Sequence, residues 1–238
     1  PDPATFCSGS SILLTATASN GIPPYNYLWS TGSTTNTTMV TSGGIVYVSV
    51  TDQNGSGCTV TSSKIVTEYP TPNVYNVSGG GSYCSGGSGV VVGLTNSETG
   101  VNYQLQLNGT NIGSPKLGTG SPLGFGLQTA AGTYTIVASN TSTGCTSDMT
   151  GNAIITIDPL PTADAGPDQS ICLNDCTSLT AAGSGAGGSY IWSNGGTSAT
   201  INICPTTTTM YSITVTDING CTDSDDVTVT VLPNPTAD

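Results

Sequence analysis

The chain has 238 residues, and only 7% of them are charged, compared with about 25% in ordinary globular domains. Its 14 acidic residues outweigh two lysines, so the formal net charge is −12. This charge repels phosphate backbones and anionic lipid headgroups, which excludes nucleic acid as a partner. No apolar run approaches the roughly 18 residues that a membrane-spanning helix needs, so we also expect no membrane insertion.

Pairs of prolines divide the chain into repeats. They lie at Pro1 and Pro3, Pro70 and Pro72, Pro159 and Pro161, and Pro233 and Pro235. We therefore predict three domains, covering 1–71, 72–160 and 161–234. The second domain diverges from the others and has longer middle loops. The last residues read PTAD, as do Pro161–Asp164, so 235–238 are expected to begin a further repeat.

Apolar residues alternate with polar ones along most of each repeat. The first repeat shows this from Ile12 to Ala18 and from Ile45 to Val50. Alternation rich in Val, Ile, Thr and Tyr indicates strands, and the turn residues that interrupt it about every ten positions indicate a β-sandwich. For the third repeat we predict strands near 177–182, 188–193, 198–203, 210–217 and 225–232, with an extended entry near 164–171. Six or seven strands are expected in each repeat.

Several aromatic residues recur at the same place in different repeats. Trp29 and Trp192 each lie in the middle of a predicted strand, where a tryptophan is typical of a sandwich core; the second repeat has Leu105 instead. Tyr47, Tyr134 and Tyr211 recur at the start of the penultimate strand, where a hydroxyl can tie a corner to nearby backbone. We interpret all of these residues as structural.

The eight cysteines occur in even numbers in each repeat. A first-strand cysteine follows each proline pair, and a late-turn cysteine follows the turns VTDQNGSGC, VASNTSTGC and VTDINGC. Their regular separations of 51, 61 and 49 residues favour the pairs Cys7 with Cys58, Cys84 with Cys145, and Cys172 with Cys221. Elimination then pairs Cys176 with Cys204, although four cysteines in one repeat allow three connectivities. Disulfides of this kind clamp the last strand to the first and require an oxidising compartment.

Metal binding and catalysis are poorly supported by the sequence. Zinc sites usually need CxxC spacing or histidine, and the chain has neither. Calcium is the alternative, because oxygen ligands gather at Asp52, Asn54, Asp217, Asn219, Asp223 and Asp225, but Asx turns explain Asp52 and Asp217 without a metal. Asp223, Asp225 and Asp226 could form an acid pair, yet glycosidase pairs face each other across a cleft. We predict no catalytic residue, no cofactor and no enzyme.

Longer motifs add a resemblance. PTADAGPDQSIC, YIWSNGGTSATINI, YSITVTDINGC and VTVTVLPNPTAD resemble the Ig-like and PKD-like repeats of giant cell-surface proteins of Bacteroidota, including gliding-motility adhesins. The resemblance covers the first and third repeats well and the second more loosely, through GTYTIVASNTSTGC. It implies an all-β tandem array of three disulfide-stapled sandwiches, secreted by the type IX route to the cell surface.

The expected function is structural and adhesive. The chain would form part of a stiff extracellular stalk or filament that mediates cell-surface adhesion or gliding, with neighbouring repeats, surface glycans or like filaments as its partners. Two alternatives stay open: a carbohydrate-binding or spacer module of a secreted enzyme, and a subunit of an ordered extracellular filament.

Overall fold

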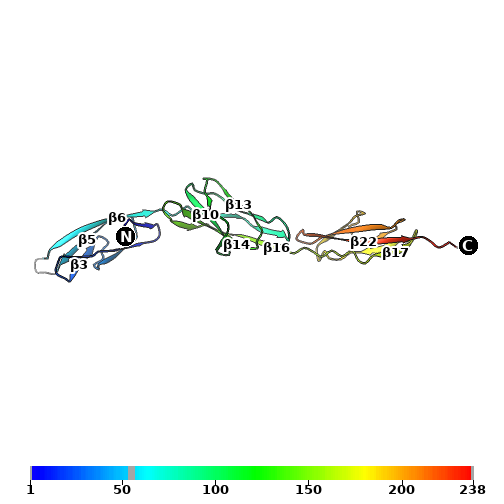
Figure 1. The fold of residues 1–238 in the computed structure, drawn as a ribbon, viewed down its shortest axis with the longest axis horizontal. Coiled ribbons are helices and arrows are strands. Elements are labelled where there is room, and N and C mark those ends of the chain that lie inside the picture. The colour runs from blue at the N-terminus through cyan, green and yellow to red at the C-terminus, as the bar shows by residue number, and fades with distance from the viewer. Residues whose placement is uncertain (1, 53–56, 237–238) are drawn as a thin grey trace. The chain divides into compact units, whose positions relative to one another are not determined.

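The computed structural model describes residues 2–52 and 57–236, and these residues form strands joined by turns (Figure 1). The first sandwich contains β1 (Ala4–Cys7), β2 (Ile12–Thr15), β3 (Tyr25–Trp29), β4 (Thr37–Val40), β5 (Gly44–Asp52) and β6 (Thr59–Tyr69). The third sandwich contains β17 (Gln169–Cys172), β18 (Thr177–Thr180), β19 (Ser189–Trp192), β20 (Thr200–Ile203), β21 (Thr209–Thr216) and β22 (Thr222–Leu232). Within the described ranges, no helix is long and apolar enough to cross a membrane.

The middle repeat has more and shorter strands. They are β7 (Val77–Gly79), β8 (Gly81–Cys84), β9 (Val90–Leu94), β10 (Val101–Leu107), β11 (Thr110–Asn111), β12 (Lys116–Leu117), β13 (Leu123–Gln128), β14 (Gly132–Asn140), β15 (Thr146–Asp148) and β16 (Ala153–Asp158). The extra residues between β10 and β14 form β11 and β12, which both pair antiparallel with β10. The longer middle loops predicted for this repeat thus add two short strands to its sheet.

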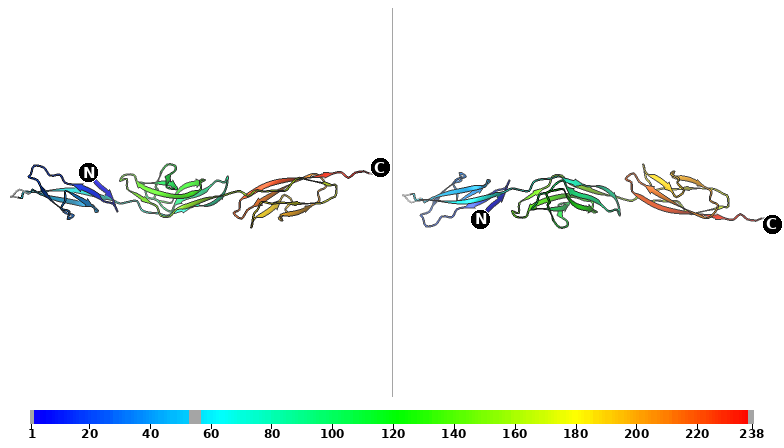
Figure 2. Two further views of the ribbon diagram at one scale, coloured as in Figure 1. Left: turned by 90° about the horizontal axis from the view of Figure 1, so that it is seen from below. Right: turned by 90° about the horizontal axis from the view of Figure 1, so that it is seen from above.

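The first and third sandwiches share one topology. In the third, one sheet has the strand order β17-β22-β21-β19 and the other pairs β18 with β20; in the first, the orders are β1-β6-β5-β3 and β2-β4. The two layers can be followed in the yellow-to-red part of Figure 2. In both sandwiches the first strand runs parallel to the last. Two small sheets connected in this order form an Ig-like sandwich, so the chain is an all-β tandem array of such sandwiches.

Strand alternation places the apolar residues between the two sheets. The core of the third sandwich consists of Ala165, Leu179, Ala181, Trp192, Ile203, Ile213, Val215, Val227 and Val229. Trp192 and Trp29 are 2% and 5% exposed, so their predicted core role is confirmed. Each indole Nε1 donates a hydrogen bond to a backbone oxygen, Trp192 to Ser198 at 3.1 Å and Trp29 to Thr35 at 2.9 Å. Leu105 occupies the core of the middle repeat and is 4% exposed.

Of the three recurring tyrosines, Tyr134 is the one that ties a corner to the backbone. Its hydroxyl donates to the carbonyl of Ala130 at 2.7 Å, and its side chain is fully buried. Burial raises the pKa of this hydroxyl above its ordinary value. Tyr47 lies exposed instead, and Tyr211 is half-buried against the core of the third sandwich.

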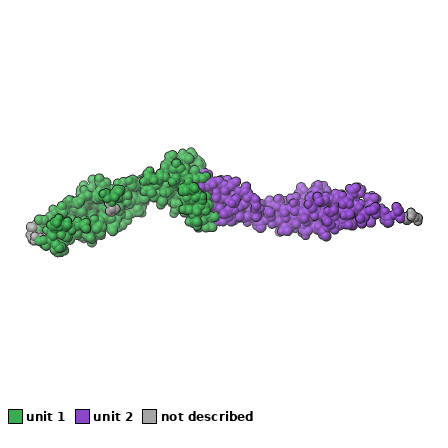
Figure 3. Space-filling model, viewed as in Figure 1, with its two compact units in different colours: residues 1–77, 94–123, 135–152 green, residues 78–93, 124–134, 153–238 purple. Residues whose placement is uncertain are grey.

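The chain forms two compact units, shown in two colours in Figure 3. The first unit contains residues 1–77, 94–123 and 135–152, and the second contains residues 78–93, 124–134 and 153–238. Both units therefore draw on the middle repeat. Each disulfide described below lies within a single unit.

Candidate functional site: disulfide junctions and an open groove

The disulfides connect residues of different repeats. Cys7 is bonded to Cys145 and Cys84 to Cys221, with Cα–Cα distances of 5.6 and 5.5 Å. The expected pairs Cys7 with Cys58, Cys84 with Cys145, and Cys172 with Cys221 are therefore wrong. Cys176 is bonded to Cys204, which is the pair expected by elimination.

The parallel pairing of the first and last strands explains why the expected pairs do not form. Cys7 lies opposite Tyr69, at the end of β6, whereas Cys58 immediately precedes the start of that strand. The 11 residues of β6 separate these two ends by roughly 35 Å. A disulfide requires Cα atoms within about 7 Å. Cys172 lies opposite Leu232 in the same way, 11 residues along β22 from Cys221.

Each first-strand cysteine thus lies at the exit end of its repeat, opposite the last residue of its final strand. The same backbone bond marks this end three times: the amide after the cysteine donates to the last strand, from Ser8 to Tyr69, from Ser85 to Asp158 and from Leu173 to Leu232, at 2.8 to 2.9 Å. Two of these cysteines, Cys7 and Cys84, are joined to the next repeat. Cys172 carries a free, exposed thiol at the equivalent place.

Each late-turn cysteine lies at the opposite end of its repeat and is positioned by an Asx residue. The amides of Asp52, Asn140 and Asp217 donate to the carbonyls of the cysteines that follow them, at 3.1, 2.8 and 2.9 Å. Asp217 Oδ1 also accepts from the amides of Asn219 and Cys221, at 2.9 and 2.8 Å. The bonded late-turn cysteines, Cys145 and Cys221, are completely buried, whereas Cys58 is exposed.

The carboxylates considered for calcium or catalysis have structural contacts. Asp223 Oδ2 and Asp225 Oδ2 accept from the amides of Ala163 and Ala165, both at 2.9 Å. The amide of Ala165 is the main reason that the pKa of Asp225 lies below its ordinary value. Asp52 Oδ1 accepts from the amide of Cys58, and Asn54 lies outside the described residues. Across residues 2–52 and 57–236, no three His, Cys, Asp or Glu residues gather as a metal site would require.

Asp223 and Asp225 hold the entry segment of the third repeat, which we define as the extended residues between its proline pair and β17. This segment also bonds to the residues that follow β18, because Asp164 and Ala182 exchange two backbone hydrogen bonds, at 3.2 and 2.8 Å. The segment therefore lies between the edges of the two sheets, where it buries Ala165 in the core.

The entry segment of the middle repeat fills the equivalent slot. The amide of Thr95, just after β9, donates to the carbonyl of Asn76 at 3.0 Å. On the other side, the amide of Val77 donates to Thr150 and the amide of Thr150 donates to Tyr75, both at 2.9 Å. Two of the three repeats thus have an extended segment inserted between their sheets.

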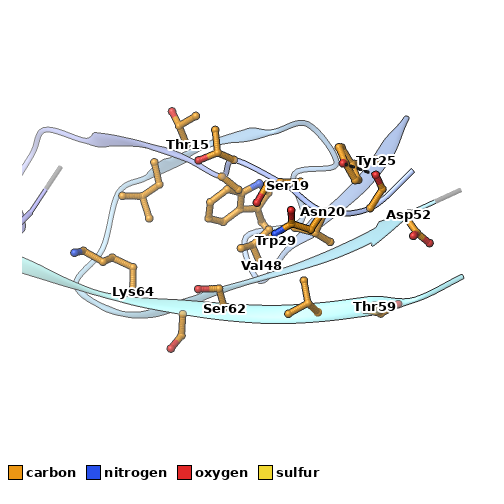
Figure 4. Close-up of a pocket in the computed structure, with 18 of the residues that line it drawn as sticks. Thr15, Ser19, Asn20, Tyr25, Trp29, Val48, Asp52, Thr59, Ser62 and Lys64 are labelled. Atoms are coloured by element: carbon orange, nitrogen blue, oxygen red, sulfur yellow. Dashed lines mark hydrogen bonds between the residues drawn. The ribbon is translucent and has the colours of Figure 1, made fainter. Parts of the chain in front are cut away.

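In the first sandwich this slot is an open groove of about 700 Å³. One wall is the stretch from Leu14 to Gly21, which leaves β2, and the other is the stretch from Thr59 to Lys64 of β6. Figure 4 shows Trp29 and Val48 between these walls, with Thr15, Ser19, Ser62 and Lys64 along the rims. The groove therefore has an apolar floor and polar rims. Strand β1 pairs only with Val66–Tyr69 of β6, so the edge of β6 along the groove is not covered by it.

Comparisons with known proteins show likeness to other chains of tandem sandwich domains. No family model and no curated protein matches the chain. A fragment of titin, domains I67–I69, is 11% identical with a TM-score of 0.43, over 96% of this chain and 95% of that one. The N-terminal eight Ig domains of Down Syndrome Cell Adhesion Molecule are 13% identical to this chain, with a TM-score of 0.45, over 96% of this chain and 35% of that one. Fibronectin(III)-like modules of Clostridium thermocellum CbhA are 16% identical to this chain, with a TM-score of 0.34, over 66% of this chain and 94% of that one.

Proposed function

We propose that this chain is a load-bearing segment of a secreted adhesive stalk or filament at a cell surface. The observation that carries the proposal is the pair of disulfides from the exit end of one repeat to the late turn of the next, which span 138 and 137 positions in sequence. Each of these bonds crosses a Pro-x-Pro connector, so two covalent links, the connector and the disulfide, join each repeat to the next. The resemblance to Bacteroidota surface adhesins supports the same role.

The pattern of bonds has a mechanical meaning. When the chain is pulled from its ends, tension passes from Cys7 to Cys145, back along the middle repeat to Cys84, and across to Cys221. Most of the first and third repeats is bypassed by this path and does not bear the load. Disulfides are stable in an oxidising environment such as the cell exterior, which fits the proposed location.

Single-molecule stretching between the two termini tests the proposal. The shortest covalent path through the oxidised chain contains about 85 residues, so full extension should reach roughly 300 Å at about 3.5 Å per residue. A matched control with Cys7→Ser and Cys84→Ser keeps only the bond between Cys176 and Cys204, and should extend to roughly 740 Å. Equal extensions for the two proteins would contradict a load-bearing role for the junctions. Labelling of intact cells with an antibody against the chain tests its surface location.

A further inference from the structure

The outer face of the larger sheet in the first sandwich carries a group of exposed apolar side chains. In this sheet β3, β5 and β6 lie side by side (Figure 1). Trp29, Val48 and Val66 are buried on the core side, so the residues that alternate with them point outwards. Four of the outward residues are large and apolar, with exposed fractions from 47% to 68%. We call them the apolar patch: Leu28, Ile45, Tyr47 and Ile65.

The strand register brings the four residues of the apolar patch together. Ile45 lies directly opposite Ile65, and Tyr47 follows two positions along β5 on the same face. Leu28 lies opposite Ser49, the next outward residue of β5. Leu28 and Ile65 are therefore diagonal neighbours of Tyr47 on either side, within reach of its ring. Tyr47 occupies the centre of the patch.

The third sandwich has the same topology but a different centre on this face. Counted from the residue opposite each core tryptophan, Tyr47 corresponds to Ser212. The tyrosine of the third sandwich, Tyr211, lies one position earlier and packs against the core, because a shift of one residue turns a side chain to the other face. Asp226 lies opposite Ser212. The fold therefore does not require an apolar centre on this face, and the patch is a property of the first sandwich.

A preceding repeat does not cover the equivalent face of the third sandwich. Ile191 and Met210 correspond to Leu28 and Ile45, and they are 54% and 62% exposed although the middle repeat precedes them. The exposure of the apolar patch therefore does not depend on what precedes the first sandwich.

The rest of this outer face is polar and uncharged. The hydroxyl oxygens of Ser49 and Thr61 lie 3.2 Å apart, and those of Thr51 and Thr59 lie 2.9 Å apart, so these side chains hydrogen-bond in pairs across the strands. Hydroxyls that are already paired cost less to remove from water than unpaired ones. An apolar centre without charge and with a polar rim is typical of a protein interface. The remaining outward residues along β3, β5 and residues 59–67 are Asn26, Ser63 and Thr67.

We propose that the apolar patch is a contact between two copies of this chain, packed face to face through their first sandwiches. Each copy has 14 acidic residues and two lysines, so copies repel each other except where a face without acids meets itself, as a two-fold contact allows. A basic partner would be matched by acids on this face, and a glycan by hydroxyls that are not paired with each other. The inference deepens the proposed function, because it names a second stalk as the partner.

The size of the face sets the strength of the contact. Three strands spaced by about 4.8 Å, with nine residues in β5, cover roughly 14 by 30 Å, or about 400 Å² on each copy. The total of about 800 Å² is below the roughly 1,200 Å² that stable interfaces bury, so the contact is weak and reversible. Chains held side by side on one surface meet at a high effective concentration, which favours such a contact.

Sedimentation equilibrium of the full chain tests the association. Cys58→Ser and Cys172→Ser form the background, so that these exposed cysteines cannot link copies. We expect dimers at about 1 mM and monomers below about 10 µM. Monomers at about 1 mM would overturn the proposal.

Two matched substitutions in this background locate the contact. Ser63→Asp places next to the patch the acid that the third sandwich has at the equivalent position, so the variant should fold, which circular dichroism checks. It should weaken dimerisation about tenfold or more, because like charges then face each other. Ser189→Asp adds the same charge to the outer face of the third sandwich and should change dimerisation less than about twofold. Equal effects of the two substitutions would also overturn the proposal.

Hydroxyl-radical footprinting gives an independent readout of the face. The oxidation of Tyr47 relative to that of Met210 should fall at least about twofold between dilute and concentrated protein, because the dimer covers Tyr47 and leaves Met210 exposed. An unchanged ratio, or binding of a neutral polysaccharide to the monomer that Tyr47→Ser abolishes, would contradict the contact between copies. The stretching experiment concerns disulfides within single chains, so its failure and a failure here are distinguishable.

Discussion

The disulfide between Cys84 and Cys221 offers a direct test of the connectivity between repeats. Replacing Cys221 with serine should expose one new thiol at Cys84 and leave the bond between Cys7 and Cys145 intact. Pairing within repeats would instead release Cys172. Alkylation of the denatured, unreduced protein at acidic pH traps the thiols before they exchange, and peptide mapping then identifies the labelled cysteine.

The structure also sets the size of the stability change. The bond spans 137 positions, so chain-entropy arguments assign it about 5 kcal/mol if the whole chain unfolds. If only the third sandwich unfolds, the closed loop runs from the connector to Cys221, about 60 residues, and the contribution is about 4 kcal/mol. With a urea dependence of about 1 to 2 kcal/mol per molar for a unit of this size, the midpoint should fall by at least about 2 M. Fluorescence of Trp192, measured in a Trp29→Phe background, follows this transition.

The matched control is Cys172→Ser, which should change the unfolding free energy of the third sandwich by less than about 0.5 kcal/mol, because Cys172 is exposed and not disulfide-bonded. Pairing within repeats makes the opposite prediction, since the loss of Cys172 would then cost as much as the loss of Cys221. Equal destabilisation by the two substitutions would refute the connectivity described here.

Three further predictions concern the third sandwich. Asp225→Asn should reduce the loss of stability of this sandwich at acidic pH. The lowered pKa of Asp225 stabilises the fold above pH about 4, and this stabilisation is lost as the pH falls through the folded-state pKa. Denaturation midpoints from pH 7 to 2 measure the difference. Trp192→Ala should cost about 3 to 5 kcal/mol in urea unfolding, because it leaves a cavity at a fully packed site. Gly183→Ala should destabilise the sandwich in the same assay, because its φ is +106° and a Cβ would lie 1.9 Å from the carbonyl oxygen of Thr162. Gly185→Ala, at a φ of +68° and with no atom within 4 Å of the added Cβ, should cost distinctly less.

The sequence predicts the strands well because the alternation of apolar residues is local. The predicted strands of the third repeat coincide with β18 to β22 within a few residues, and both tryptophans lie in the core. The Asx turn at Asp217 was also predicted from its local sequence and is confirmed by the two amides that bind its carboxylate.

The disulfide connectivity could not be predicted in the same way, because it depends on strand direction. Regular spacing within each repeat is equally compatible with bonds inside repeats and with bonds between successive repeats. The parallel pairing of β1 with β6 decides between them, because it places Cys7 and Cys58 at opposite ends of an 11-residue strand. The separation of about 50 residues within a repeat does not depend on the direction of the first strand. The direction of that strand therefore has to be known before the cysteines can be paired.

The groove was missed for a related reason. The entry segments of the middle and third repeats look like linkers in the sequence, since both follow prolines and that of the third repeat, TADAGPD, contains no large apolar residue. In the structure they fill a slot between two sheets, and Ala165 becomes part of the core. A linker by composition therefore completes the sandwich that follows it.

The two long disulfide loops overlap, because Cys84 lies inside the loop closed by Cys7 and Cys145, and Cys145 lies inside the loop closed by Cys84 and Cys221. A protease that cuts the backbone once anywhere between Cys7 and Cys221 consequently releases no fragment. Three cuts can also leave every piece attached, one in each of the stretches 7–84, 84–145 and 145–221. This holds when the last cut falls between Cys176 and Cys204, because their disulfide joins the final two pieces. A nicked chain of this kind keeps its full mass until its disulfides are reduced.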